Sequence, residues 1–208
     1  MNIALLLVAG SLACKAPAPQ DTAWLRAPSP VRDGIHASDT EQSLRARYGE
    51  SAVTRDRVQL GEGQTAPGLV LYATDPRRRL EIQFIDTVRL TTPIRATVTE
   101  PGSLWIVYPG ITIGTCLDSL ERLNAGPFVL LGFDWDYAGT VMSWSDGRLA
   151  AQWPRDREGA QSVLLRLEPG ITPAEVALAR GLAGDREFRS TAMRKLNPHV
   201  YEISVRPR

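Results

Sequence analysis

The stretch GITIGTCLDSLERLN (residues 110–124) decides the fold, because GIHASDTEQSLRARYGE (34–50) repeats its pattern earlier in the chain. Both stretches open with Gly-Ile, and at the same distance along each the pair Ser-Leu recurs, as Ser43-Leu44 and Ser119-Leu120. Strand-like runs and a turn that contains Asp follow in both cases. A repeated order of elements at this scale is typical of a duplicated unit. The sequence therefore predicts two related halves.

The earlier stretch, residues 34–50, predicts a short helix with a capped start. Ser38 and Glu41 have the spacing of a capping box, in which each side chain satisfies a backbone N–H of the first turn. Leu44 and Tyr48 are four residues apart and so share the face that we expect to be buried. Gly49 is a suitable residue to end the helix.

The second stretch predicts a helix that begins near Thr115, buries Leu117 and Leu120, and stops at residues 124–126. A third, short helix is expected from Thr172 to about Leu182. The run Thr-Pro-Ala-Glu at its start combines a capping box with proline at the first helical position.

Strands are predicted where apolar and β-branched residues alternate or cluster between turn signals. Asp146-Gly147 is a two-residue hairpin signal between two of them. The predicted strands are 53–60, 69–73, 80–85, 94–98, 104–107, 128–137, 140–144, 149–153, 162–167 and 199–205. The fold class is therefore α+β: two related helix-on-antiparallel-sheet units in one domain (34–208, halves about 34–108 and 109–208), plus the short third helix.

The N-terminus predicts export. Residues 3–13 are apolar or small, too few to span a hydrocarbon core of ~30 Å, which needs about 20 residues. Such a run is typical of a secretory signal peptide, here residues 1–13. The following Cys14 completes a sequence that resembles the lipobox of bacterial lipoproteins, although Ser11 and Leu12 depart from its preferred residues. Lipidation at Cys14, a soluble secreted protein and an unprocessed chain remain open. Residues 14–33, rich in Pro and Ala, are expected to form a tether whose two large apolar residues, Trp24 and Leu25, dock against the domain.

The chain of 208 residues has two cysteines. If Cys14 carries lipid, Cys116 is a lone thiol; if it does not, a Cys14–Cys116 disulfide can form. The 24 basic residues, of which only Lys15 and Lys195 are lysines, nearly balance 23 acidic ones. A net charge of +1 gives no electrostatic case for nucleic acid as a partner.

A family resemblance is carried by residues 110–115, by Pro127-Phe128 and by the segment Gly132-Phe-Asp-Trp-Asp-Tyr-Ala-Gly139. These motifs resemble a group of uncharacterised bacterial lipoproteins and secreted proteins, over roughly residues 35–206. The resemblance implies no activity. The order of elements is also loosely similar to that of beta-lactamase-inhibitor-protein-like modules and of small outer-membrane-assembly lipoproteins, which bind other proteins.

Two carboxylates are the candidates for catalysis. If residues 128–137 form one strand, Asp134 and Asp136 lie on the same face with their Cα atoms about 6.6 Å apart, at ~3.3 Å per residue. That spacing suits an acid/base pair of a hydrolase or carbohydrate-active enzyme. The competing interpretation is a half-buried strand that exposes its acids to water.

Aromatic residues offer a possible binding surface. Four aromatics form either a stacking platform for sugar or peptide or part of the core, since sheets bury large aromatics at alternate positions: Trp135, Tyr137, Trp144 and Trp153. The possible binding surface consists of Asp134, Trp135, Asp136, Tyr137 and Trp144.

The sequence favours a non-catalytic protein. It contains no P-loop, dinucleotide fingerprint, nucleophile elbow, zinc signature or HExxH motif, so neither a cofactor nor a metal is expected. The expected function is that of a cell-envelope lipoprotein, anchored to the membrane through Cys14 on the periplasmic face or else secreted. It would bind an envelope protein or a cell-wall component. The alternative is the hydrolase that uses Asp134 and Asp136.

Overall fold

The computed structural model describes residues 25–26, 34–107, 110–153 and 163–207. The signal peptide and Cys14 lie outside these ranges. In chain order the elements are β1 (Leu25–Arg26), α1 (Glu41–Tyr48), η1 (Glu50–Ala52), β2 (Val53–Gly61), β3 (Gln64–Leu71), β4 (Leu80–Asp86), β5 (Thr91–Val98), β6 (Ile106–Val107), α2 (Leu117–Asn124), β7 (Val129–Leu131), β8 (Val141–Ser143), α3 (Arg148–Gln152), β9 (Val163–Glu168), α4 (Pro173–Arg180), β10 (Glu187–Arg189), η2 (Ser190–Met193) and β11 (His199–Val205).

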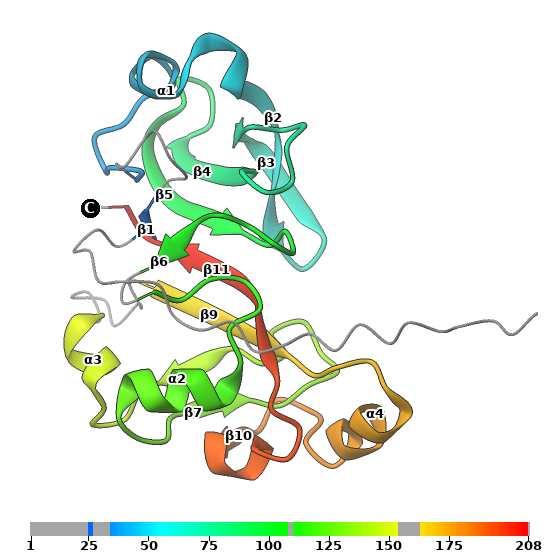
Figure 1. The fold of residues 1–208 in the computed structure, drawn as a ribbon. Helices are drawn as coiled ribbons and strands as arrows, with labels where there is room; N and C mark the ends of the chain where they lie inside the picture. The colour runs from blue at the N-terminus through cyan, green and yellow to red at the C-terminus, as the bar shows by residue number, and fades with distance from the viewer. Residues whose placement is uncertain (1–24, 27–33, 108–109, 154–162, 208) are drawn as a thin grey trace, which may run out of the picture.

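The fold is α+β with antiparallel sheets, as the sequence predicts. The main sheet has six strands in the order β2-β3-β4-β5-β11-β9, and a smaller sheet has the order β10-β7-β8. The last strand, β11, crosses the middle of the molecule and pairs with β5, so that Ile203 lies opposite Val98 (Figure 1). Strands from both predicted halves therefore form one sheet, a link that the repeat in the sequence does not indicate.

The N-cap of helix α1 lies two residues later in the chain than predicted. Thr40, not Ser38, is the N-cap residue, and the reciprocal partner of the capping box is Ser43. The physical reason lies in Asp39, whose buried carboxylate pairs with Arg47 in the last turn of the helix (3.0 Å). That ion pair fixes Asp39 outside the helix, and the first turn starts after it.

The repeat is visible in the two main helices. Ser43 and Ser119 both occupy the third position of their helices, and the following Leu44 and Leu120 are both fully buried. The predicted cap of α2 is wrong by one residue. Cys116 is the N-cap residue, while the hydroxyl of Thr115 accepts a hydrogen bond from the Thr112 N–H (3.1 Å).

The predicted strand 149–153 is wrong, because these residues belong to α3. The expected hairpin turn is wrong with it, since Gly147 is the N-cap residue of this helix. The cap has no side chain, and its role is taken by Asn124 at the end of α2. The Asn124 Oδ1 accepts a hydrogen bond from the N–H of Leu149 in the first turn of α3 (3.1 Å). A side chain 25 residues earlier in the chain thus supplies the helix start.

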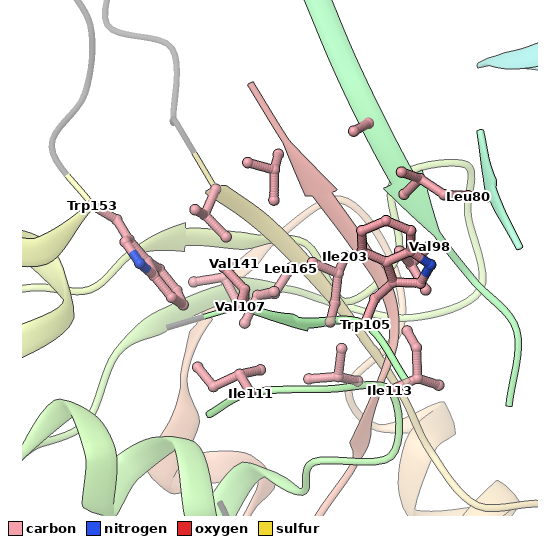
Figure 2. Close-up of a cluster of buried hydrophobic side chains, with 14 of the residues drawn as sticks. Leu80, Val98, Trp105, Val107, Ile111, Ile113, Val141, Trp153, Leu165 and Ile203 are labelled. Atoms are coloured by element: carbon pink, nitrogen blue, oxygen red, sulfur yellow. The ribbon is translucent and has the colours of Figure 1, made fainter. Parts of the chain in front are cut away.

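One core runs through both halves. Leu80 and Val98 from the first half and Val141 and Leu165 from the second belong to the same cluster of buried side chains, with Ile203 of β11 among them (Figure 2). Because the core is continuous, the two halves pack as one domain. The backbone of Leu25 forms a ladder with β6, in which it lies opposite Val107, while Trp24 lies outside the described residues.

Candidate functional site

The segment at residues 132–139, here called the aromatic loop, is not part of a strand. Strand β7 ends at Leu131, Phe133 forms an isolated bridge with Ala183, and the chain then turns. Asp134 adopts the left-handed backbone conformation, with φ 62°. An L-residue at positive φ interrupts the extended geometry of a strand. The predicted strand 128–137 is therefore wrong beyond Leu131.

This turn removes the geometric basis of the catalytic hypothesis. Asp134 and Asp136 are both exposed on the loop, and the alternation of a strand does not relate their side chains. Among the described residues, no group of three or more His, Cys, Asp or Glu side chains is arranged to hold a metal ion. The two carboxylates are thus exposed to water, as in the competing interpretation, but they lie on a turn and not on a strand.

The aromatic loop is braced by its own backbone. Gly139 N–H donates to the Gly132 carbonyl (3.0 Å), and Ala138 N–H donates to the Trp135 carbonyl (3.0 Å). The indole Nε1–H of Trp135 also donates to the Gly132 carbonyl (3.2 Å). Gly139, at φ 65°, lies so close to β9 that an added Cβ would be 1.7 Å from the Leu167 carbonyl oxygen. The loop therefore has a defined conformation and is fixed at its base.

Tyr137 connects this loop to the first half of the chain. Its hydroxyl donates a hydrogen bond to Glu62, at the tip of the β2–β3 hairpin. This hydrogen bond to the carboxylate raises the pKa of the Tyr137 phenol. On its other side the ring lies 5.4 Å from the guanidinium carbon of Arg166 on β9. Tyr137 is thus held between the two halves.

Polar side chains of β9 and β11 lie close to the aromatic loop. The Arg166 guanidinium is 3.5 Å from the carboxylate of Glu202, and the Tyr201 hydroxyl donates to the Ala138 carbonyl (3.5 Å). Burial raises the pKa of Tyr201. The Nε of Arg166 is buried without a hydrogen-bond partner. The sequence analysis missed Glu62, Arg166, Tyr201 and Glu202, because only the pairing of β9 with β11 and the turn at Asp134 bring them together.

The four aromatic candidates fall into two groups. Trp135 and Tyr137 meet edge to face on the loop, with ring centroids 5.3 Å apart, and Tyr137 is 40% exposed. Trp144 is a correction to the predicted binding surface, because it is only 4% exposed. Its ring packs against Phe128 (4.9 Å) and Trp153 (5.3 Å) in the core. The binding surface that remains consists of residues 134–137.

Cys116 is buried at the N-cap of α2 and is disulfide-bonded, so it offers no free thiol for catalysis. The only other cysteine of the chain, Cys14, lies outside the described residues. His199 pairs with Glu168 across the β9–β11 ladder (3.3 Å). These contacts give Cys116 and His199 structural roles.

Comparison with known proteins finds no matching family, no matching curated protein and no matching solved structure. The resemblance to uncharacterised bacterial lipoproteins therefore stays a prediction. Within the described ranges, every helix is too short or too polar to cross a lipid bilayer.

Proposed function

We propose that this protein is an exported, non-catalytic binding protein of the cell envelope, and that it binds a cell-wall glycan at the aromatic loop. The observation that carries the proposal is the Trp135–Tyr137 pair. Two large aromatic side chains stand on a braced surface loop, outside the core that holds the other tryptophans of the second half. Aromatic side chains in this position are typical of binding surfaces.

The chemistry of the loop suits a sugar ring. The aromatic faces can pack on the apolar C–H face of a sugar, while the exposed carboxylates of Asp134 and Asp136 accept hydrogen bonds from its hydroxyl groups. The backbone hydrogen bonds of the loop and the Tyr137–Glu62 bond fix these groups before binding. A surface ordered in advance loses less conformational entropy on binding, and this favours affinity.

The size of the surface favours a glycan over a folded protein. A stable protein interface takes ~800 Å² and about 20–30 residues from each partner. The aromatic loop and the tip of the β2–β3 hairpin together present only a few exposed side chains, chiefly Asp134, Asp136, Tyr137 and Glu62. Such a surface matches one or two sugar rings.

The test is co-sedimentation of the purified protein with protein-free cell-wall sacculi. Trp135→Ala should weaken binding by about 5- to 10-fold, the loss that corresponds to ~1–1.5 kcal/mol of aromatic contact. Adding Asp134→Asn and Asp136→Asn to the Trp135→Ala variant should weaken binding to sacculi further. Asp146→Asn, an exposed aspartate outside this loop, is the matched control and should bind like the wild type. Equal binding by all variants would show that the aromatic loop is not the binding site. Capture of an envelope protein without binding to sacculi would show that the ligand is not a glycan.

The membrane anchor is a separate part of the proposal and has its own test. A lipid thioether at Cys14 and a Cys14–Cys116 disulfide exclude each other, because both use the Cys14 sulfur. The disulfide recorded at Cys116 supports export, since disulfides persist in oxidising compartments. The intact mass of protein isolated from cells decides the anchor. An acylated N-terminus supports lipidation, whereas an unacylated mass that gains two hydrogens on reduction rules it out.

A further inference from the structure

We propose that the end of the β4–β5 hairpin docks on an anionic lipid surface. Three aliphatic side chains are exposed there: Ile85 (68%), Val88 (81%) and Ile94 (39%). Single exposed aliphatic residues are common on protein surfaces, but three on one hairpin need an explanation, and we call these three residues the hairpin patch. This patch is separate from the aromatic loop and does not depend on its function.

The turn that presents Val88 is rigid. One carboxylate oxygen of Asp86 accepts hydrogen bonds from the N–H groups of Val88 (3.0 Å) and Arg89 (2.8 Å). The buried Leu90 donates its N–H to the Asp86 carbonyl (2.8 Å) and accepts from the Glu41 N–H at the start of α1 (3.3 Å). Turn positions of this kind usually carry Gly, Asn, Asp or Ser. Here the turn holds a β-branched aliphatic side chain in water.

The charges around the patch favour an anionic partner. Arg89 and Arg95 are both exposed and lie next to Val88 and Ile94 in the chain. One oxygen of the Asp86 carboxylate accepts hydrogen bonds from the turn backbone, and the other lies 3.8 Å from the Arg89 guanidinium. The pKa of this carboxyl is lowered chiefly by the Arg89 N–H. Two arginines against one aspartate leave the hairpin end cationic.

A membrane fits this combination better than a protein. Aliphatic side chains flanked by arginines enter the headgroup region of a bilayer, while the guanidinium groups attract anionic lipids. Stable protein interfaces are larger and usually have an aromatic residue at their centre, and the exposed residues of this patch include none. The patch is therefore assigned to phospholipid headgroups and not to a protein partner.

The experiment is co-sedimentation of the full chain with vesicles of phosphatidylcholine, with and without phosphatidylglycerol. The measured quantity is the increase in binding caused by phosphatidylglycerol, because an acyl chain on the protein would insert into both kinds of vesicle. The wild type should bind phosphatidylglycerol vesicles at least tenfold more than phosphatidylcholine vesicles, and high salt should reduce this difference.

Val88→Asp should abolish the increase. Its side chain is exposed, so near-UV circular dichroism should show an unchanged fold. The matched control is Ile171→Asp, because Ile171 is 95% exposed and precedes α4 in the chain. Helix α4 lies in the lower part of the molecule, whereas β4 and β5 lie in the upper part (Figure 1). Ile171→Asp should retain the increase. No effect of phosphatidylglycerol on the wild type, or equal binding by Val88→Asp and the wild type, overturns the proposal. Equal loss in both aspartate variants also overturns it, because the effect would then be one of net charge.

Discussion

The side chain of Asn124 links α2 to α3, and its removal should destabilise the protein strongly. Asn124 is fully buried and makes three hydrogen bonds. Its Nδ2 donates to the carbonyls of Gly126 (3.1 Å) and Trp144 (3.0 Å), and its Oδ1 accepts from the Leu149 N–H (3.1 Å). Asn124→Ala would leave the Leu149 N–H without a partner inside the fold, whereas the Trp144 carbonyl would keep its hydrogen bond from the Gly147 N–H (3.1 Å).

The expected cost follows from one orphaned backbone N–H and two further lost hydrogen bonds. The unsatisfied Leu149 N–H costs about 1–3 kcal/mol and each of the other two bonds contributes about 0.5–1.5 kcal/mol, so the variant should lose about 2–6 kcal/mol. That is a large share of a total stability of about 5–15 kcal/mol. With a typical urea dependence of ~2 kcal/mol/M, the unfolding midpoint should fall by about 1–3 M. The Trp144–Trp153 ring pair lies at α3, so near-UV circular dichroism should weaken as well.

A double-mutant cycle with Gly147 separates this mechanism from a general packing loss. An added Cβ at Gly147 would be 2.1 Å from the Asn124 Oδ1, so Gly147→Ala should cost about 1–3 kcal/mol in the wild type. In the Asn124→Ala background the obstacle is absent, and the second change should cost much less. Gln42→Ala on the exposed face of α1 is the control and should shift stability by less than ~0.5 kcal/mol. A loss below ~1 kcal/mol for Asn124→Ala, or additive effects in the cycle, would refute the role assigned to Asn124.

Three further predictions concern other buried contacts. Gly139→Ala should cost more than ~3 kcal/mol, because residue 139 has a positive φ and its added Cβ would overlap the Leu167 carbonyl. The thermal midpoint measured by circular dichroism should therefore fall. A midpoint equal to that of the wild type would contradict this prediction and show that β9 can move away. Asp39→Ala should cost about 2–4 kcal/mol in urea unfolding, less than for a fully buried pair because Arg47 keeps some exposure, and a loss under 1 kcal/mol would contradict this. Burial raises the pKa of Tyr48, so its neutral form is favoured in the folded state. Its stabilising contribution is fully present below the unfolded pKa of about 10 and is lost as pH rises above it. Absorbance at 295 nm should therefore show Tyr48, like Tyr137 and Tyr201, ionising at higher pH than in the unfolded chain, and Tyr48→Phe should reduce the step at alkaline unfolding by one tyrosine.

Elements with local signals were predictable from the sequence. The capping box of Thr172 and Glu175, with Pro173 at the first helical position, is present in α4 as predicted. Strands β2, β4 and β11 lie where alternation predicts them, and Leu44 is buried as its helical spacing requires. These signals involve residues within a few positions of one another, so these elements need no partner that is distant in the sequence.

The candidate site was predictable only in part. The sequence singled out Trp135, Tyr137 and Trp144 by residue type, but it could not separate the surface pair from the core residue. That separation depends on Asp134, whose left-handed conformation ends the strand and breaks the alternation. Nothing near Tyr137 in the sequence indicates its contact with Glu62, because the hairpin that carries Glu62 belongs to the other half of the chain.

By itself, the sequence determined the α+β class and the two repeated helices, and it predicts an exported leader, since each depends on short-range patterns of residues. Only the tertiary structure decided that residues 148–152 form a helix, that the aromatic loop turns at Asp134, and that β11 joins the two halves in one sheet. The physical reason is the same in the first and last cases. A buried backbone group must find a hydrogen-bond partner, and the partner supplied by Asn124 or by β5 is distant in sequence and close only after folding.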